Sequence, residues 1–553
     1  MIFEYQRRAT TPARVGDIRI GGTAPIVVQS MANVNTNDIE AGIRQANRIF
    51  EAGAEMVRFT TQGTKEALAL GRIREGLRAQ GRTAPLVADV HFRREVAFVA
   101  AEQVEKVRIN PGNFYDTVIK RGQHFTEESY QEDLEGLRSE LGRFVDLCKA
   151  KGVAIRIGVN HGSLSGRIMD RYGDTPEGMV ASCMECLEVC AEKRFSDVVI
   201  SIKSSNTAVM TETVLLLVRE MDKRDMHYPL HLGVTEAGDG EDGRIKSAVG
   251  IGTLLSYGLG DTIRVSLTEP PENEIPVARL LVSLAEGLEG HRIVVPDDAL
   301  LSPAENKDFA LSETCLVIAD EDPSLSILPA DKHPDIMVRK EEEEAFDILT
   351  DMEVISGKKF PETGRRRVVE LTHPDVPLML RALDACLARG YIVRLQMDAA
   401  PDELPVRLGF ALGAKLLCGK HLGGLWLRSA SVTSAELTRL AFALLQASRI
   451  RFTKTEFIAC PSCGRTLFDL PSTLHAVREA TGHLKGLKIG VMGCVVNGPG
   501  EMADADYGYV GSGVGLVDLY KGREKVERAI PASEAVSHLI ALIKAGGDWQ
   551  DPE

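Results

Sequence analysis

The first 290 residues alternate short runs of β-branched residues with longer amphipathic helical stretches, such as the one over residues 37–54. Eight such runs occur, at residues 24–30, 56–61, 85–92, 104–110, 154–160, 197–206, 229–235 and 261–267. Eight strand–helix units in about this length predict an α/β fold of the (β/α)₈ (TIM) barrel type. The alternative, an open doubly wound sheet, would need a dinucleotide-binding glycine fingerprint after the first strand, and none is present.

The pattern changes after residue 290. Residues 291–365 are rich in charge and proline, which predicts linkers and exposed helices. Strand patterns then resume at 365–373, 391–399 and 423–429, with helical patterns at 376–389 and 434–447. We therefore predict a barrel domain over 1–290, a smaller α/β insert over 291–450 that acts as a structural spacer, and a C-terminal domain over 451–553.

Composition narrows the class of protein. Hydrophobic residues make up 44% and charged residues 26% of the 553 positions, as in ordinary globular proteins, and no apolar run is long enough to span a membrane. The N-terminal segment lacks an apolar core and carries Glu4 and Asp17, so we predict a cytoplasmic protein. A net charge of −14 argues against broad nucleic-acid binding.

Basic residues occupy the polar faces of the predicted barrel strands. In DTIRVSL, for example, Arg264 alternates with Ile263 and Val265, and the apolar face must meet the helices. The same alternation turns five cations into the barrel near the carboxyl ends of its strands: Arg58, Arg108, Arg156, Lys203 and Arg264. Buried cations without partners cost several kcal/mol each, and Asp89 alone is too little to neutralise five. A bound anion such as a diphosphate is the simplest partner, and an ion-pair network with acidic loop residues is the alternative.

Ten cysteines are too few for a disulfide scaffold of this length. Cys183, Cys186 and Cys190 have helical spacing with no glycine or proline nearby, so we predict core packing for them. The same prediction applies to the isolated cysteines, which are Cys148, Cys315, Cys386 and Cys418.

Three further cysteines have the setting of a metal site. Pro461 and Gly464 bend the chain around Cys460 and Cys463, and Cys494 follows an apolar strand predicted at 487–492. Three thiolates leave a four-ligand site one short. His475, His483 or Glu501 could complete it, and a Cys₃His site would hold zinc.

Motifs spread along the chain resemble those of the 4-hydroxy-3-methylbut-2-enyl diphosphate synthase family. QSM (29–31), LVADVHF, VRINPGN, RIGVNHGSL, SIKSSN, LHLGVTEAG and GDTIRVSL are similar to its barrel motifs, and CPSCGRT and MGCVVNGPGE to its cluster motifs. The likeness covers about 1–290 and 451–553, and 291–450 resembles the insert of the longer three-domain members. It implies a C-terminal α+β iron–sulfur domain of the sulfite/nitrite reductase type.

The resemblance also implies the chemistry, which is reductive ring opening and dehydration of 2-C-methyl-D-erythritol 2,4-cyclodiphosphate in the methylerythritol phosphate isoprenoid pathway. A ferredoxin or flavodoxin would supply electrons to a [4Fe–4S] cluster held by Cys460, Cys463, Cys494 and Glu501. The five cations would bind the diphosphate. Glu236, and after it His91, are the candidate proton donors. The residues expected to orient the substrate carbons are Asp89, His91, Asn110, Asn160, Asn206 and Ser266.

The resemblance implies a dimer for the shorter family form, in which the cluster domain of one chain caps the barrel of the other. We hypothesise that the insert lets closure occur within one chain. Two other functions remain open from the residues alone. One is a pterin-dependent transferase-like barrel with a structural zinc site, and the other is an iron–sulfur carrier or sensor without catalytic activity.

Overall fold

The computed structural model describes residues 1–551 except Phe92, 116–123, 302–314, Lys420, Ser462, Arg465, 496–499, Glu501 and Ala503. The chain divides into two compact units. We call residues 9–240, 260–279 and 454–553 the barrel–cysteine unit, and residues 1–8, 241–259 and 280–453 the insert unit. The domain boundaries predicted near 290 and 450 stay predictions.

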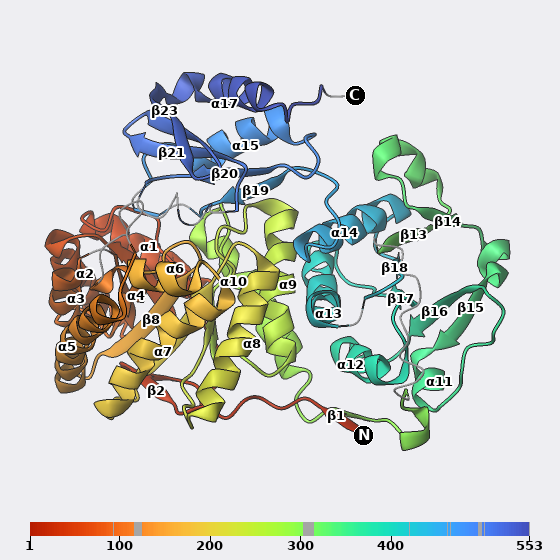
Figure 1. Cartoon of the computed structure of the whole chain (residues 1–553), viewed down its shortest axis with the longest axis horizontal. Coiled ribbons are helices and arrows are strands. Elements are labelled where there is room, and N and C mark those ends of the chain that lie inside the picture. Colours follow the sequence, from red (N-terminus) through yellow and green to blue (C-terminus); the bar gives the residue numbers. More distant parts are fainter. Residues whose placement is uncertain are drawn as a thin grey trace. The chain divides into compact units, whose positions relative to one another are not determined.

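The barrel–cysteine unit contains an eight-stranded parallel sheet in the order β10-β11-β4-β5-β6-β7-β8-β9 (Figure 1). A single parallel bridge between Ile200 and Leu230 brings its two ends together. Each of the eight predicted runs contains or overlaps one strand, so the barrel prediction is confirmed. The strands are β4 (Val27–Met31), β5 (Met56–Thr61), β6 (Leu86–Val90), β7 (Lys106–Ile109), β8 (Ala154–Asn160), β9 (Val198–Lys203), β10 (His231–Leu232) and β11 (Thr262–Ile263).

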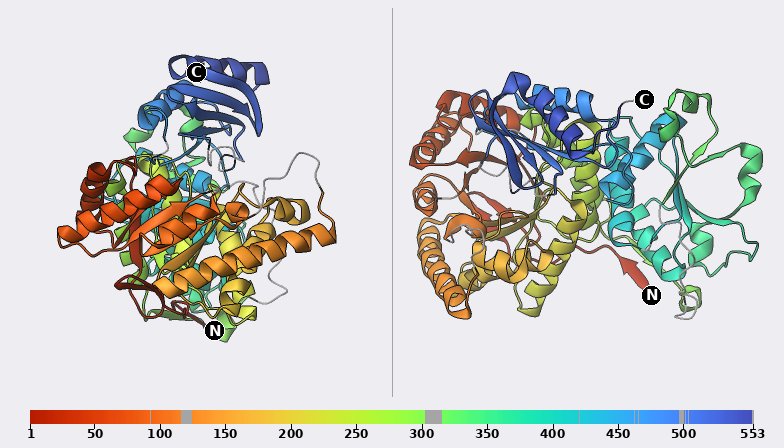
Figure 2. Two further views of the ribbon diagram at one scale, coloured as in Figure 1. Left: turned by 90° about the vertical axis from the view of Figure 1, so that its left-hand side faces the viewer. Right: turned by 45° about the horizontal axis from the view of Figure 1, so that its top comes forward.

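Helices surround these strands on the outside (Figure 2). They include α1 (Ile39–Glu51), α2 (Thr64–Ala79), α3 (Arg94–Ala101), α4 (Pro111–Phe114), α5 (Glu127–Lys151), α6 (Gly166–Tyr172), α7 (Pro176–Glu192) and α8 (Thr207–Lys223). A hairpin of β2 (Ala13–Val15) and β3 (Ile18–Ile20) packs Val15 and Ile20 against residues at the amino-terminal half of the strands, such as Met56 and Ala154. This apolar cluster fills one end of the barrel and leaves the carboxyl ends of the strands for polar side chains.

The C-terminal part of this unit is a five-stranded mixed sheet, in the order β19-β20-β21-β22-β23. Its strands are β19 (Glu456–Ala459), β20 (Lys488–Met492), β21 (Tyr507–Gly513), β22 (Leu516–Lys521) and β23 (Glu524–Pro531). The helices α15 (Leu470–Thr481) and α17 (Ala532–Gly546) lie together on the sheet (Figure 1). Leu474, Val477, Ile489 and Leu539 are buried in the resulting core.

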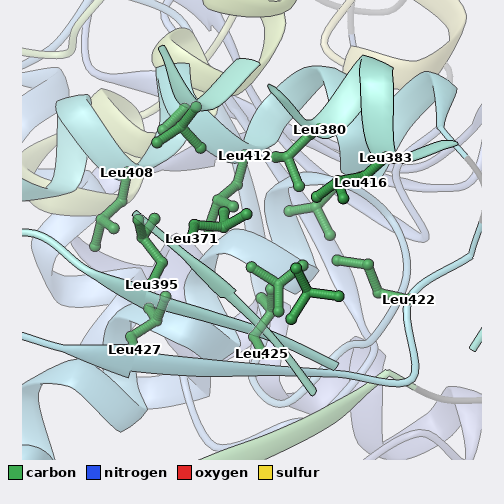
Figure 3. Close-up of a cluster of buried hydrophobic side chains, with 14 of the residues drawn as sticks. Leu371, Leu380, Leu383, Leu395, Leu408, Leu412, Leu416, Leu422, Leu425 and Leu427 are labelled. Atoms are coloured by element: carbon green, nitrogen blue, oxygen red, sulfur yellow. The ribbon is translucent and has the colours of Figure 1, made fainter. Parts of the chain in front are cut away.

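The insert unit contains a six-stranded parallel sheet in the order β14-β13-β18-β17-β16-β15. Leucines from β16, β17, β18, α12 and α13 form its core (Figure 3). Strand β1 (Ile2–Glu4) pairs antiparallel with β12 (Arg292–Val294) in the same unit. The main elements are α9 (Gly240–Ser256), α10 (Glu274–Glu286, divided between the two units), β13 (Leu316–Asp320), β14 (Ile336–Val338), β15 (Phe346–Thr350), α11 (Asp351–Ile355), β16 (Arg366–Leu371), α12 (Val376–Cys386), β17 (Ile392–Gln396), α13 (Leu404–Cys418), β18 (Gly424–Arg428) and α14 (Ser434–Ala447).

Two sequence predictions are wrong here. Residues 291–365 are not only linkers and exposed helices, because β13, β14 and β15 lie among their charged segments. These strands have only three to five residues, and pairing with parallel neighbours buries Val317, Val338 and Leu349 without a long periodic pattern. Cys418 is exposed rather than in the core, because it is the last residue of α13.

The other predicted core cysteines are buried, and the helix α7 carries Cys183, Cys186 and Cys190. Among the helices of the described residues, none is long and apolar enough to cross a membrane.

Candidate functional site

One cavity of the barrel–cysteine unit gathers most of the predicted site residues. It has a volume of about 70 Å³. All five predicted cations line it, and so do Cys460, Cys463 and Cys494. The other lining residues are Met31, Asp89, His91, Asn160, Thr235, Glu236, Ser266, Pro461, Met492 and Gly493.

Strand register places the charged side chains of the barrel next to one another. Asp89 of β6 pairs with Arg108 of β7, and Arg108 pairs with Arg156 of β8. Since neighbouring strands lie about 4.8 Å apart, equivalent positions bring their side chains into contact. Arg108 and Arg156 are 2% and 1% exposed, so their charges lie in an environment that screens them poorly.

Asp89 is the shared counter-ion of three of these guanidinium groups. Its carboxylate lies 3.3 Å from Arg108, and 3.9 Å from both Arg58 and Arg156. His91 Nε2 lies 3.3 Å from the same carboxylate. Burial alone would raise the pKa of Asp89, but the charges of Arg58, His91 and Arg108 outweigh burial and lower the pKa well below its usual value. Asp89 therefore stays ionised at neutral pH.

Arg264 has a counter-ion that the sequence prediction missed. Glu274, at the start of α10, accepts hydrogen bonds from Arg264 Nε at 3.1 Å and Nη2 at 2.9 Å. The Ser30 hydroxyl and the Leu267 amide donate to the same carboxylate at 2.6 and 3.2 Å. The alternative of an internal ion pair thus holds for Arg264, and its acid comes from a helix rather than from a loop.

The cavity nevertheless carries excess positive charge. Six buried cations (Arg58, Lys106, Arg108, Arg156, Lys203 and Arg264) accompany three buried carboxylates (Asp89, Glu236 and Glu274) in this part of the described structure. Burial, together with neighbouring cations, lowers the pKa of Arg58 to about 10 and the pKa values of Lys106, Arg156 and Lys203 well below their usual values. A bound anion would reverse this cost.

Arg156 marks a place for an anion in the cavity, and Lys106 is a further buried cation that does not line it. Arg156 Nε and Nη1 are buried and have no hydrogen-bond partner among the described residues. Lys106, which the prediction did not include among the site residues, is completely buried, and its ammonium contacts the sulfur of Met56 at 3.4 Å. Since Arg156 lines the cavity, the space in front of it suits an anionic ligand.

The three cysteines come from two neighbouring parallel strands. Cys460 directly follows β19, and Cys494 lies two residues beyond β20. Because the carboxyl ends of parallel strands meet at one edge, the two thiols face the same cavity as Cys463. The Gly493 amide donates to Cys460 Sγ at 3.3 Å. Burial and the neighbouring thiol of Cys463 raise the pKa of Cys460 well above its usual value.

This donor set fits an iron–sulfur cluster. All three cysteines are outside disulfide bonds, and amide–sulfur hydrogen bonds such as that of Gly493 are known to tune clusters. Within the described ranges, no three His, Cys, Asp or Glu side chains are grouped as ligands of a single ion. Each thiolate of a cubane cluster binds its own iron, so such ligands stand farther apart than those of one zinc ion.

Two of the three candidates for a fourth metal ligand lie away from the cavity lining. His475 pairs with Glu479, and His483 contacts the carbonyl of Gln550, and neither lines the cavity. Glu501 lies outside the described residues.

Segments of the barrel and of the C-terminal sheet of the same chain contact each other beside the cavity. Ala237 forms a parallel bridge with Ala459, and the Thr268 hydroxyl donates to the Cys460 carbonyl at 3.0 Å. A Cβ atom at Gly162, where φ is +79°, would lie 2.0 Å from the carbonyl oxygen of Gly500. Only glycine permits this approach of the two backbones.

Glu236 has a strained backbone at the same place. Its φ is +48°, in the left-handed region that costs a non-glycine residue about 1 kcal/mol, and its side chain is buried in the cavity wall. Strain of this kind is found where a side chain must be held in one direction for a task.

Two predicted substrate-binding residues do not line the cavity. The side chain of Asn110 accepts from the Gly112 amide and caps α4, and that of Asn206 accepts from the Ala208 and Val209 amides and caps α8. Met31, Thr235 and Met492 line the cavity but were not predicted. The two methionines are apolar residues at strand ends, which no pattern distinguishes from the core, and Thr235 is a single hydroxyl residue beyond a short strand.

The amino-acid sequence is similar to known proteins over its whole length. Residues 10–279 match the family of the GcpE TIM-barrel domain, and residues 456–545 match the family of the GcpE protein C-terminal domain. The chain belongs to the GcpE family. A relative from Parabacteroides distasonis is 48% identical, with 99% of each chain covered, and one from Porphyromonas gingivalis is 48% identical, with 100% of this chain and 99% of the relative covered.

A third relative, from Leptospira interrogans, is 38% identical over 100% of this chain and 98% of its own. All three are named 4-hydroxy-3-methylbut-2-en-1-yl diphosphate synthase (flavodoxin). Coverage of this extent shows that these relatives include the insert as well. The predicted membership of the 4-hydroxy-3-methylbut-2-enyl diphosphate synthase family is confirmed.

Proposed function

We propose that this chain is a 4-hydroxy-3-methylbut-2-enyl diphosphate synthase of the methylerythritol phosphate pathway, acting in the cytoplasm with flavodoxin as electron donor. Its reaction opens the ring of 2-C-methyl-D-erythritol 2,4-cyclodiphosphate, takes up two electrons and two protons, and releases water. The names of the relatives support this function. The single observation that carries it is the cavity that excess buried cations and three cysteines line together.

The arginines and lysines of the cavity would bind the diphosphate. Guanidinium groups match phosphate oxygens with paired N–H donors, and Arg156 has two nitrogens without partners among the described residues. The cavity volume of about 70 Å³ is well below the roughly 300–1,000 Å³ of typical ligand pockets. Binding must therefore widen it, and Arg58, whose Nη2 lies 2.9 Å from Met31 Sδ, can turn from this weak acceptor to a phosphate oxygen.

Cys460, Cys463 and Cys494 would hold a [4Fe–4S] cluster, with Glu501 as the fourth ligand implied by the family resemblance. When bound, such a cluster supplies single electrons and Lewis acidity beside the substrate. The chain's own contribution is the position of the substrate, since Asp89 and Asn160 both line the cavity and would orient hydroxyl groups next to the diphosphate. Asn160 Oδ1 accepts a hydrogen bond from Arg108 Nη2 at 3.2 Å, so Asn160 lies next to a guanidinium group that would bind the diphosphate.

Glu236 is our proposed proton donor for the departing water. Asp89 is unsuitable, because its lowered pKa keeps it ionised and able only to accept hydrogen bonds. Glu236 lies in the wall of the cavity that also contains the cysteines, and its strained backbone holds it there. His91 is the second candidate, although it contacts Asp89 and Arg108 and is thus already engaged.

We further propose that the site closes within one chain. The contacts of Ala237 with Ala459 and of Gly162 with Gly500 support this, since both sides belong to one molecule. Mixing a Cys494→Ser chain with an Arg264→Ala chain tests it. At a substrate concentration well below KM, we expect the mixture to be no more active than the Arg264→Ala chain alone, and higher activity would show closure between two chains of a dimer.

Anaerobic purification followed by iron, sulfide and zinc determination tests the function itself. We expect iron and sulfide in the wild type, turnover of the cyclodiphosphate with reduced flavodoxin, and no cluster in a Cys494→Ser variant that keeps its circular dichroism spectrum. Stoichiometric zinc without iron would favour the transferase-like barrel. Iron without reductive turnover would favour an electron carrier.

A further inference from the structure

The loop that carries Glu236 is held in part by the C-terminal sheet of the barrel–cysteine unit. Ala237 forms its parallel bridge with Ala459 of β19, and both residues are buried. On the other side of Glu236, the Thr235 amide donates to the Ser204 carbonyl of the barrel at 3.2 Å. Glu236 therefore lies between one anchor that belongs to the barrel and one that belongs to the sheet with the cysteines.

An ion pair adds a second connection to the sheet, three residues beyond Glu236. Arg478 of α15 donates to the Asp239 carboxylate at 2.5 Å, and the two side chains are 33% and 31% exposed. The guanidinium carbon of Arg478 also lies 5.3 Å from the centre of the Phe457 ring, which belongs to β19. Since the ring and the carboxylate together fix the direction of the guanidinium group, Arg478 holds the Glu236 loop against the sheet.

Thr268 connects the same loop to a cysteine. Its amide donates to the Gly238 carbonyl at 2.9 Å, and its hydroxyl donates to the Cys460 carbonyl at 3.0 Å. Thr268 is buried, so both hydrogen bonds are shielded from water. A displacement of the C-terminal sheet would break the hydroxyl bond of Thr268, the bridge of Ala237 and the ion pair of Arg478 together.

The backbone of Glu236 requires support of this kind. Residues 233–239 form an irregular loop between β10 and α9, and Glu236 has its φ of +48° within it. A non-glycine residue keeps such a conformation only where the surrounding structure imposes it. Two of the contacts that impose it here, those of Ala459 and Arg478, come from the C-terminal sheet and its helix.

We propose that Arg478 is a positioning residue, which keeps Glu236 in the orientation of a proton donor while the C-terminal sheet covers the barrel. This inference rests on the proposed function, in which the proton passes from the Glu236 carboxyl to the oxygen that leaves as water. Arg478 acts through Asp239 and the loop, and it does not line the cavity. The proton donor and Cys460 thus reach their places together, as in an induced fit.

Turnover of the cyclodiphosphate by the full-length, cluster-loaded enzyme with reduced flavodoxin tests this role. Arg478→Met keeps an apolar stem against Phe457 and removes the charge, Asp239→Asn removes the partner charge, and Arg478→Lys keeps the charge. Arg523→Met is the matched control. Arg523 lies between β22 and β23 and forms an ion pair of the same kind with a barrel loop, at 3.0 Å from Asp174, without contacting residues 233–239.

We expect Arg478→Met to lower kcat about threefold to fivefold and to change KM by less than about twofold, because a partly exposed ion pair stabilises the placed loop by about that factor. Asp239→Asn should show the same loss, and the double variant no larger loss than either single one. The solvent deuterium isotope effect on kcat should rise in Arg478→Met, since proton transfer becomes slower. Arg478→Lys should keep at least about half of the wild-type kcat, and Arg523→Met should keep both the kcat and the isotope effect of the wild type.

An unchanged kcat in Arg478→Met would overturn the proposal, as would equal losses in Arg478→Met and Arg523→Met. A rise in KM without a loss of kcat would also overturn it, because Arg478 would then act on substrate binding. If Arg478→Met loses iron, Asp239→Asn carries the test, since it leaves the C-terminal sheet unaltered.

Glu236→Gln separates this inference from the proposed function. A wild type without turnover contradicts the function itself, and an active Glu236→Gln contradicts the assignment of the proton donor. An inactive Glu236→Gln together with a fully active Arg478→Met contradicts only the role of Arg478.

Discussion

Replacing Asp89 by asparagine tests the electrostatic account of the barrel cavity. The substitution conserves shape and removes one buried negative charge that lies 3.3–3.9 Å from three guanidinium groups. One such pair at 4 Å is worth about 4 kcal/mol of Coulomb energy at an effective dielectric constant near 20, and desolvation offsets much of it. Breaking a buried pair typically costs about 3–5 kcal/mol. We expect Asp89→Asn to lower the free energy of unfolding by about that amount at pH 7.

The pH dependence follows from the lowered pKa of Asp89. A carboxyl whose pKa is lower in the folded than in the unfolded state stabilises the fold above its unfolded pKa of about 3.9, and this contribution is lost as the pH falls through the folded value. The stability difference between wild type and Asp89→Asn should therefore stay constant between pH 7 and pH 5. Urea denaturation followed by circular dichroism measures it at each pH.

Inorganic diphosphate adds a second test to the same variant. In the wild type, Asp89 competes with a bound anion for the guanidinium groups, so the anion should stabilise Asp89→Asn more than it stabilises the wild type. Asp298→Asn, at an exposed position, serves as the control and should change stability by less than about 0.5 kcal/mol. The electrostatic account would be refuted if diphosphate stabilised the wild type and Asp89→Asn equally. It would also be refuted if the stability difference between these two proteins shrank between pH 7 and pH 5.

Three further substitutions probe other parts of the site. Arg264→Ala should raise KM for the cyclodiphosphate at least about tenfold while iron content stays unchanged, because a guanidinium that lines the cavity is lost; an unchanged KM would show that Arg264 serves only its ion pair with Glu274. Gly162→Ala should lower turnover at least about tenfold with the cluster retained, because its Cβ would meet the Gly500 carbonyl, whereas Gly81→Ala has a similar φ of +80° in open space and should leave turnover unchanged. Lys106→Met should raise the urea midpoint and increase the free energy of unfolding by about 1–3 kcal/mol, since it replaces a buried ammonium whose hydrogen bond in the described structure goes to a methionine sulfur; a lower midpoint would show that the charge is required.

Local patterns of the sequence were enough to predict the features that depend on residues close together in the chain. Period-two alternation identified the inward face of each barrel strand, and with it Arg58, Arg108 and Arg156. Proline and glycine around Cys460 and Cys463 separated these thiols from the helical series of Cys183, whose residues are buried in α7. In both cases the decisive geometry, strand pleat or helix turn, repeats within a few residues.

Other features depended on contacts between distant segments. Glu274 pairs with Arg264 only because the start of α10 returns to the end of a barrel strand, and Asn110 and Asn206 serve as helix caps rather than cavity residues. The short strands β13 to β15 exist because parallel neighbours bury them.

The sequence by itself determined which residues carry charge or sulfur and which face of an element each occupies. Only the tertiary structure decided which of these charges meet a counter-ion, how deeply Lys106 and Tyr391 are buried, and that three cysteines face the barrel cations across one cavity. The physical reason is that local periodicity is set by backbone geometry, whereas burial and charge pairing depend on which distant segments fill the surrounding space.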